Sequence, residues 1–165
     1  MGRIPTQTDW IYNLYVKEHV EKTQSMKVKF KKLHENAVIP QYAKPGDAGM
    51  DLVATSIDTD ENGNIVYGTG LAVEIPAEFV GLIYPRSSNA KKDLYLTNHV
   101  GVIDSGYRGE IMFKLRTTQK NPKMYSVGDR IGQLIIMPYP QIEPVEVEDL
   151  STTERGVGGF GSSGN

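Results

Sequence analysis

The stretch Leu71-Ala-Val-Glu-Ile-Pro-Ala-Glu-Phe-Val-Gly-Leu-Ile-Tyr-Pro85 decides the fold class of this chain. Apolar residues alternate with small or polar ones over 71–75 and stop at Pro76, and a compact apolar run over 79–84 then stops at Pro85. Such patterns are typical of β-strands, because side chains along a strand point alternately to its two faces. The stretch therefore predicts two consecutive short strands.

Similar patterns lie on both sides of these two predicted strands. Alternating or continuous apolar residues predict further strands over 28–30, 111–116, 131–137 and 145–147. Turn signals separate the strands at Asn62-Gly63, Gly68-Thr69-Gly70, Ser105-Gly106 and Val127-Gly128-Asp129. Many short strands at this spacing predict an all-β fold, a jelly-roll-like β-barrel, with one helical turn at 89–94.

The two ends of the chain differ from the part between them. A short helix is predicted over 10–21, whereas Met26 begins the alternating pattern of a strand. We therefore divide the chain into an N-terminal extension over 1–25, a β-barrel domain over 26–154 and a flexible glycine-rich arm over 155–165. The extension is an added helix, a segment that binds a protein partner or a remnant of cloning, and these three alternatives stay open.

Composition and charge exclude several classes of protein and site. A net charge of -2 disfavours binding to duplex nucleic acid, which usually requires a basic face. No apolar run approaches the roughly 18 residues that span a membrane, and no signal-peptide pattern opens the sequence. The sequence contains no cysteine for disulfides, zinc–thiolate sites or thiol nucleophiles, and its three histidines are scattered without ligand spacing. A cytoplasmic location is the default expectation.

The last eleven residues, Arg155-Gly-Val-Gly-Gly-Phe-Gly-Ser-Ser-Gly-Asn165, contain too little apolar area to form part of a core. A glycine-rich terminus is often simply frayed. Backbone N–H groups, hydroxyls and a guanidinium also bind phosphate oxygens, and the flat ring of Phe160 can stack on a base. The tail is therefore either a frayed end or a phosphate-binding lid.

Two internal segments combine turn geometry with reactive side chains. The segment 98–111 is predicted to form a hairpin with its bend at 104–106, which brings the Asp104 carboxylate close to the Tyr107 ring. An aspartate in a turn normally bonds a backbone N–H two residues on, so a structural role competes with a catalytic one. Pro85-Arg-Ser-Ser88 ends a strand and opens a short helix, where backbone amides attract anions but an ordinary serine cap is an equal alternative.

Five motifs follow one another along the chain in a specific order and spacing. They are Ala48-Gly-Met-Asp-Leu52, Pro85-Arg-Ser-Ser88, Asn98-x-x-Gly-Val-Ile-Asp-Ser-Gly-Tyr-Arg-Gly109, Gly128-Asp-Arg-Ile-Gly-Gln-Leu134 and Arg155-Gly-x-Gly-Gly-Phe-Gly-Ser-Ser-Gly164. Together they closely resemble the motifs of the trimeric dUTPases, over 26–165 but not over 1–25. The resemblance implies a homotrimer of jelly-roll subunits, with active sites at the subunit interfaces, that hydrolyses dUTP to dUMP and pyrophosphate. This reaction keeps uracil out of DNA and supplies dUMP for thymidylate synthesis.

The resemblance also implies roles for individual residues. Asp104 matches the aspartate that activates the water attacking the α-phosphorus, and Tyr107 would lie under the deoxyribose and exclude a 2′-hydroxyl. The uracil edge would be bound around Asn98, Gly101, Val102, Ile103 and Met112. The phosphates would be bound by Arg86, Ser87, Ser88 and Gln133, and the tail would close last through Arg155, Phe160, Gly161, Ser162 and Ser163. Mg²⁺ would be held mainly by the triphosphate and waters, with Asp51 approaching it through water.

Three positions depart from the commonest family pattern. Gly132 stands where alanine is frequent and Ser163 where threonine is frequent, and both exchanges are conservative in size and chemistry. Lys92-Asp93-Leu94 replaces a common Lys-x-Gly, which affects only the local loop geometry. No matched catalytic position is lost.

Two alternatives compete with triphosphate hydrolysis. A dCTP deaminase shares the implied fold and phosphate contacts, and Glu110 lies in the region where such an enzyme needs a glutamate beside the base. The arrangement of Asp104 and Tyr107 and the complete tail favour hydrolysis over deamination. The other alternative is a regulatory protein whose nucleotide-dependent tail closure controls a partner, with 1–25 as the obvious contact segment.

Overall fold

A computed structural model describes residues 26–159 of this chain, so the helix predicted over 10–21 lies outside the described residues. The strands are β1 (Lys29–Lys32), β2 (Met50–Val53), β3 (Ser56–Thr59), β4 (Ile65–Gly68), β5 (Leu71–Glu74), β6 (Phe79–Pro85), β7 (Leu94–Leu96), β8 (Gly101–Ile103), β9 (Met112–Thr117) and β10 (Arg130–Pro138). One helical turn, α2 (Asn89–Lys92), lies at the predicted position. In this part of the chain, no helix has the length and apolar character needed to cross a membrane.

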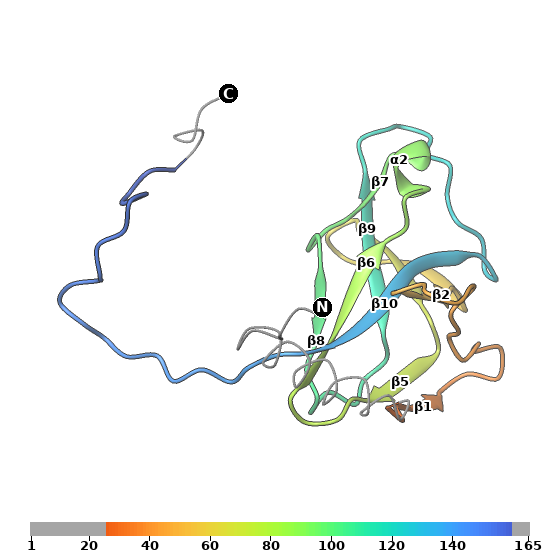
Figure 1. Ribbon diagram of the computed structural model, residues 1–165. Coiled ribbons are helices and arrows are strands. Elements are labelled where there is room, and N and C mark those ends of the chain that lie inside the picture. The colour runs from red at the N-terminus through yellow and green to blue at the C-terminus, as the bar shows by residue number, and fades with distance from the viewer. Residues whose placement is uncertain (1–25, 160–165) are drawn as a thin grey trace, which may run out of the picture.

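The strands form three antiparallel sheets (Figure 1). One four-stranded sheet has the order β2-β10-β6-β8, a second has the order β3-β4-β9-β7, and β1 pairs with β5. Strands from all three sheets contribute to one hydrophobic core, in which Leu52, Phe113 and Leu134 are fully buried. The predicted all-β, jelly-roll-like fold is confirmed, although the backbone pairing leaves three sheets that do not close into a barrel.

The segment 98–111 does not form the predicted hairpin. β8 pairs with β6, where Ile103 lies opposite Gly81, whereas β9 pairs with β4 and β7. Gly101 makes the pairing of β8 with β6 possible, because a Cβ at this position would lie 2.3 Å from Ile83 Cγ1 on β6. The bend after Ile103 therefore crosses from one four-stranded sheet to the other.

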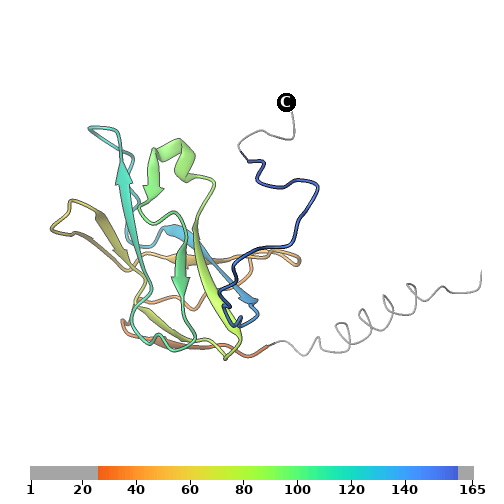
Figure 2. The same cartoon turned by 90° about the vertical axis from the view of Figure 1, so that its left-hand side faces the viewer.

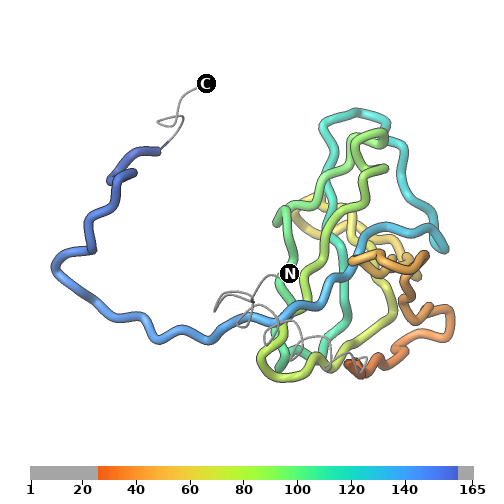
Figure 3. The backbone as a smooth tube through the Cα atoms, viewed as in Figure 1, coloured from red at the N-terminus to blue at the C-terminus, as the bar shows by residue number. Residues whose placement is uncertain are grey.

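The strand predicted at 145–147 is not formed. After β10 the chain continues over 139–159 without regular secondary structure and leaves the body of the domain in both orientations (Figures 1 and 2) and in the tube trace (Figure 3). Val145 and Leu150 in this arm are 72% and 87% exposed. An alternating pattern does not make a strand unless it pairs with a sheet edge and packs on a surface, and here the arm pairs with no strand of the three sheets and leaves its apolar side chains exposed.

Asp93 ends α2 in the left-handed conformation, with a φ of 53°. This conformation is strained for residues other than glycine, although aspartate tolerates it because its short side chain can bond nearby backbone. The Asp93 carboxylate accepts hydrogen bonds from Thr118 N at 3.0 Å, Thr118 Oγ1 at 2.7 Å and Thr117 Oγ1 at 3.2 Å. These bonds, chiefly those from Thr118, hold the pKa of Asp93 below its usual range. The Asp93 carboxylate therefore ties the end of α2 to the end of β9.

Gly132 has no space for a side chain in β10. A Cβ there would lie 2.0 Å from Phe113 Cε1 and 2.9 Å from the backbone oxygen of Tyr84. Phe113 is fully buried, and Tyr84 belongs to the paired strand β6, so neither neighbour moves away freely. An exchange of Gly132 for alanine is therefore not conservative in this chain, contrary to the expectation from sequence.

We expect Gly132→Ala to lower the free energy of unfolding by about 1–3 kcal/mol, the usual cost of overpacking a core. Because Phe113→Leu removes the ring that blocks the new methyl group, the double variant should lose less stability than the two single losses added together. Thermal and denaturant unfolding of the four proteins measures this difference. Strictly additive losses would show that Phe113 is not the obstacle.

Candidate functional site

A cavity of about 340 Å³ opens where the two four-stranded sheets meet, between β8 and β9. Seven residues that the sequence assigned to base and sugar binding or to catalysis line it: Asn98, Gly101, Val102, Ile103, Asp104, Tyr107 and Met112. Five further residues complete its lining: Ile83, Thr97, Glu110, Ile111 and Lys114. A single cavity therefore collects one part of the predicted site.

The bend at one side of the cavity is held by backbone and guanidinium contacts. Tyr107 N–H donates to the backbone oxygen of Asp104 over 3.0 Å, so the carbonyl of Asp104, and not its carboxylate, closes the turn. Arg108 Nη1 donates to the backbone oxygens of Ser105 at 2.6 Å and Tyr107 at 2.8 Å. The Asp104 side chain is exposed and lines the cavity. The bend thus presents a carboxylate to the cavity without using it for its own structure.

The Tyr107 ring is also held in place at this bend. Its hydroxyl donates to the backbone oxygen of Glu110 over 3.0 Å, and 42% of the residue is exposed. Gly109 allows the ring to fold back over the bend, since a Cβ at that position would lie 2.4 Å from the Tyr107 hydroxyl oxygen. The aromatic ring of Tyr107 and the carboxylate of Asp104 therefore come from one bend and line the same cavity.

Glu110 lines the same cavity, but its carboxylate is engaged in a structural contact. Glu110 Oε1 accepts the backbone N–H of Gly70 over 2.7 Å. Beside it, Thr69 Oγ1 donates to the backbone oxygen of Ile111 over 2.7 Å. Glu110 therefore ties the end of the bend to the turn between β4 and β5.

A second group of polar side chains gathers where β2, β6 and β10 lie side by side. Asp51 Oδ1 accepts from Arg86 Nε over 3.0 Å, and Asp51 Oδ2 accepts from Arg130 Nη1 over 2.9 Å. Gln133 lies opposite Asp51 in the pairing of β10 with β2. Two guanidiniums and one carboxylate leave one net positive charge, which suits an anionic ligand.

Ser87 and Ser88 join this group at the turn that follows β6. The turn is closed by Asn89 N–H on the backbone oxygen of Arg86 at 2.9 Å and by Ala90 N–H on that of Ser87 at 3.3 Å. The Ser88 hydroxyl lies 3.1 Å from the Tyr125 hydroxyl oxygen, on the inner side of the turn. Ser87 is exposed and Arg86 is half-buried.

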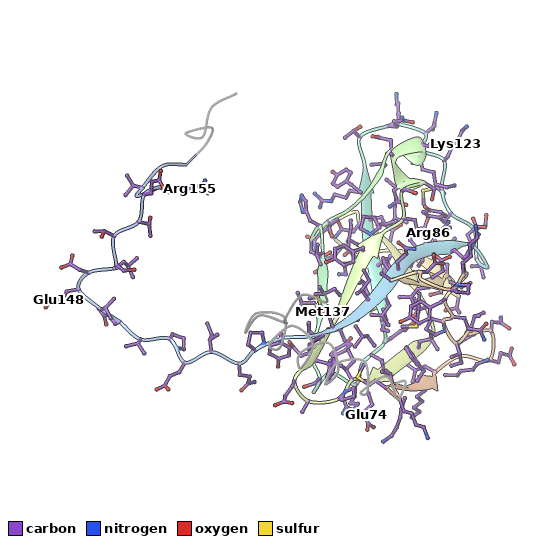
Figure 4. The ribbon with its side chains drawn as sticks, viewed as in Figure 1. Glu74, Arg86, Lys123, Met137, Glu148 and Arg155 are labelled. Carbon is purple, nitrogen blue, oxygen red and sulfur yellow. The ribbon has the colours of Figure 1, made fainter. Side chains whose placement is uncertain are left out.

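The predicted site residues therefore form two groups rather than one. None of Asp51, Arg86, Ser87, Ser88 or Gln133 lines the cavity between β8 and β9. Arg155 belongs to neither group, since it lies on the arm, far from Arg86 at the end of β6 (Figure 4). There its Nε donates to the backbone oxygen of Gly158 over 3.0 Å. The tail residues Phe160, Gly161, Ser162 and Ser163 lie outside the described residues.

Side chains in the described part of the chain do not form a metal cage of their own. Over residues 26–159, no group of three or more His, Asp or Glu side chains could hold a metal ion. Both oxygens of Asp51 accept hydrogen bonds from arginines. A carboxylate retains further lone pairs that can accept from water, so Asp51 fits an outer contact to a hydrated ion rather than direct ligation.

Several contributors to the two groups were missed by reasoning from sequence. Arg130 lies inside the fourth motif, and its charge beside Gln133 was a usable signal. Thr97 and Lys114 were not recognisable in this way, because they meet only through pairing of β7 with β9, where Thr97 N–H and Oγ1 both donate to the backbone oxygen of Lys114. Nothing in the sequence indicated that Arg108 would bond the backbone oxygens of the bend.

Comparison with known proteins identifies clear relatives. A family model described as dUTPase matches residues 35–164. A deoxyuridine 5'-triphosphate nucleotidohydrolase of Rhodococcus erythropolis is 43% identical over 144 residues, which cover 84% of this chain and 87% of the relative.

Solved structures of dUTPases have a similar fold. A Staphylococcus bacteriophage 80alpha dUTPase with dUpNHpp matches with a TM-score of 0.70 and 29% identity, covering 86% of this chain and 100% of the phage protein. A dUTPase from phage phi11 of S. aureus, described with a structural Mg(II) ion, matches with a TM-score of 0.63 and 25% identity, covering 75% of this chain and 98% of the phage protein.

Proposed function

We propose that this chain, which belongs to the dUTPase family, hydrolyses dUTP to dUMP and pyrophosphate. The observation that carries the proposal is the cavity between β8 and β9, which both an exposed carboxylate, Asp104, and an aromatic ring, Tyr107, line. The cavity suits a base and a sugar, and the arginine group around Asp51 suits a chain of phosphates. The cellular consequence would be less uracil in DNA and a supply of dUMP for thymidylate synthesis.

The base and sugar would occupy the cavity between the sheets. Backbone groups around Asn98 and 101–103, with Met112 opposite, would bond the uracil edge. Tyr107 would lie against the deoxyribose, and its ring is held in place by the hydroxyl contact to Glu110. A rigid ring at that place would exclude a 2′-hydroxyl by steric overlap.

Asp104 would act as the general base. Its carboxylate would orient a water molecule and take a proton from it as the water oxygen attacks the α-phosphorus, while the bond from that phosphorus to the bridging oxygen breaks and pyrophosphate leaves. Phosphoryl transfer depends mainly on positioning and on charge neutralisation. The Asp104 carboxylate suits the role of proton acceptor, because the turn around it is closed by other groups.

The phosphates would be bound by the second group. Arg86, Gln133 and the backbone amides of Ser87 and Ser88 would contact phosphate oxygens, with Arg130 adding charge beside them. Asp51 would hold both guanidiniums in place through its two contacts. Mg²⁺ would reach Asp51 through water and would neutralise charge on the triphosphate, since it keeps most of its waters when it binds phosphates.

We propose that the active protein is a homotrimer with its sites at subunit interfaces. The separation of the cavity from the arginine group supports this arrangement, because a nucleotide must contact both. The exposed apolar side chains of the arm also need a surface to cover them, and Ile142, for example, is 78% exposed. Sedimentation of the full-length protein should give three times the 18.3 kDa mass of one chain.

The three chain segments would have separate tasks. Residues 26–154 would form the catalytic domain, and residues 155–165 would close over the bound nucleotide, with Arg155 on the γ-phosphate and Phe160 on the base. Residues 1–25 would be available to a protein partner. A regulatory role would then depend on tail closure, and pull-downs with full-length and 26–165 proteins, with and without dUTP, would detect it.

The proposal is tested by measuring pyrophosphate release from dUTP, dTTP, dCTP and UTP. We expect turnover of dUTP alone at a substantial rate. Release of ammonia from dCTP would instead favour a deaminase of the same fold. The contact of Glu110 with Gly70 argues against that alternative, because a deaminase needs a glutamate free to activate water at the base.

Tyr107→Ala should reduce the preference for dUTP over UTP. Removal of the ring opens space for a 2′-hydroxyl, and turnover of dUTP should fall at the same time because the sugar is less well positioned. Tyr107→Phe is the matched control, since it keeps the ring and removes only the hydroxyl contact to Glu110, so its preference should stay close to that of the unmodified protein. Steady-state kinetics with both nucleotides measures the ratio, and an unchanged ratio in Tyr107→Ala would place the discrimination elsewhere.

A further inference from the structure

A buried polar cluster lies directly behind the turn that carries Arg86, Ser87 and Ser88. The loop between β9 and β10 passes over α2 at the top of the molecule (Figure 1) and brings Tyr125 against this turn. Tyr125 and Asn89 are both only 4% exposed. The Tyr125 hydroxyl donates to Asn89 Oδ1 and lies 3.1 Å from Ser88 Oγ. Because a phenol has one hydrogen to give, Ser88 is the donor in the second contact.

The Ser88 hydroxyl does not make the hydrogen bond that a serine at the start of a helix usually makes. Ser88 is the N-cap residue of α2, yet its side chain makes no capping hydrogen bond. Its backbone is helical, with φ -64° and ψ -17°, whereas an N-cap serine normally has an extended backbone and bonds an amide in the first turn. The contact with Tyr125 therefore accompanies a backbone conformation that an ordinary cap would not adopt.

Tyr125 is itself held firmly. Its backbone N–H donates to the Tyr67 hydroxyl over 3.1 Å, and the two rings meet edge to face with centroids 6.0 Å apart. The Lys92 ammonium lies 4.4 Å from the centre of the Tyr125 ring and donates to the backbone oxygen of Met124. Burial raises the pKa of Tyr67, so its hydroxyl stays protonated at neutral pH. These contacts hold the Tyr125 hydroxyl in place as the hydrogen-bond partner of Ser88.

The cluster is not built for stability alone. Among the described residues, Asn89 Nδ2 is a buried donor without a hydrogen-bond partner. Burying an unpaired donor costs free energy, and two apolar side chains of similar shape would avoid that cost. Tyr125 also precedes the turn at 126–129 that begins β10, where Arg130 and Gln133 lie. One hydroxyl therefore connects the two segments that carry the proposed phosphate contacts.

We propose that Tyr125 is a positioning residue for phosphate binding. Its hydroxyl holds the Ser88 side chain inward and so keeps the amide groups of Ser87 and Ser88 turned outward toward phosphate. The inference rests on the proposed function, because it assigns Tyr125 to the phosphate half of the dUTP site. Without this hydrogen bond, the side chain of Ser88 would no longer be held against Tyr125, and the amides would turn away from the phosphates.

The test compares affinities for two nucleotides that share the base and sugar. dUpNHpp, a dUTP in which an NH group bridges the α- and β-phosphorus atoms, reports on all the phosphates, whereas dUMP has only one. For Tyr125→Phe, which keeps the ring contacts, we expect affinity for dUpNHpp to fall about three- to tenfold, the effect of one hydrogen bond, with little change for dUMP. Tyr95→Phe is the matched control, since Tyr95 is an exposed tyrosine on β7 and should change neither affinity.

A second variant separates positioning from stability. Asn89→Leu combined with Tyr125→Phe removes the unpaired Asn89 Nδ2 together with the Asn89 oxygen that would lose its donor, so it should be more stable than Tyr125→Phe alone without recovering affinity for dUpNHpp. Ser88→Ala removes the same hydrogen bond from the other side while keeping the amide, and should show the same selective loss even if the tyrosine variants do not fold.

The outcomes distinguish the inference from the proposed function. If the unmodified protein binds dUpNHpp more tightly than dUMP, and Tyr125→Phe and Ser88→Ala keep that ratio, Tyr125 does not position the phosphate contacts and the proposed function stands. Recovery of dUpNHpp affinity together with stability in the double variant would likewise reduce Tyr125 to a structural role. If the unmodified protein does not distinguish the two nucleotides, the proposed function fails, and the inference fails with it.

Discussion

Asp104→Asn is expected to slow dUTP hydrolysis by about 10²–10⁴-fold, the usual contribution of a general base. The amide has almost the same shape as the carboxylate but cannot accept a proton from the attacking water. The fold should be unchanged, because the turn at this position is closed by the backbone carbonyl of Asp104 and by Arg108. Binding of dUpNHpp should therefore stay close to that of the unmodified protein.

Pyrophosphate release and calorimetric binding of dUpNHpp measure the two halves of this prediction. Asp58→Asn is a suitable control, since Asp58 is an exposed carboxylate on β3 and does not line the cavity. A variant of Asp104 that retained more than about a tenth of normal turnover would exclude this residue as the base, because the loss would fall short of what a general base supplies.

Removal of residues 155–165 should abolish most of the activity without unfolding the protein. In the described part of this segment, Val157 is fully exposed and Arg155 bonds only within the arm, so its loss should leave the thermal midpoint nearly unchanged without ligand. On substrate binding the segment would exchange glycine-chain entropy for charge-assisted hydrogen bonds and for stacking by Phe160. Stacking of an aromatic ring on a base contributes about 1–3 kcal/mol by itself. Turnover of the 1–154 protein should fall by orders of magnitude.

Melting curves and pyrophosphate release on the 1–154 protein, with and without dUpNHpp, test the role of the arm. The ligand should raise the melting temperature of the full-length protein more than that of the truncated one. Phe160→Ala should show part of the loss in turnover. An equally active truncated protein would show that the tail is a frayed end, and one that no longer folds would show that the tail belongs to the core.

Local pattern was sufficient for strands that are bounded by proline or contain alternating apolar residues. β5, β6, β9 and β10 were predicted within one or two residues of their observed ends for this reason. β2, β3, β4, β7 and β8 have only three or four residues each, and β3 is exposed throughout, so none showed a usable period. Predicting a strand also did not predict its partner: β8 and β9 are neighbours in sequence but belong to different sheets.

The chemistry of the candidate site was readable from sequence because each motif contains its reactive groups within a few residues. The sequence by itself thus determined the all-β class and the family, and it predicted which residues would bind a base, a sugar and phosphates. Only the tertiary structure decided how these residues are held. Asp51 meets Arg86 and Arg130 across 35 and 79 residues of chain, and Ser88 meets Tyr125 across 37. Contacts of this kind depend on which strands pair and on what the core leaves room for, and no local pattern of side chains encodes either.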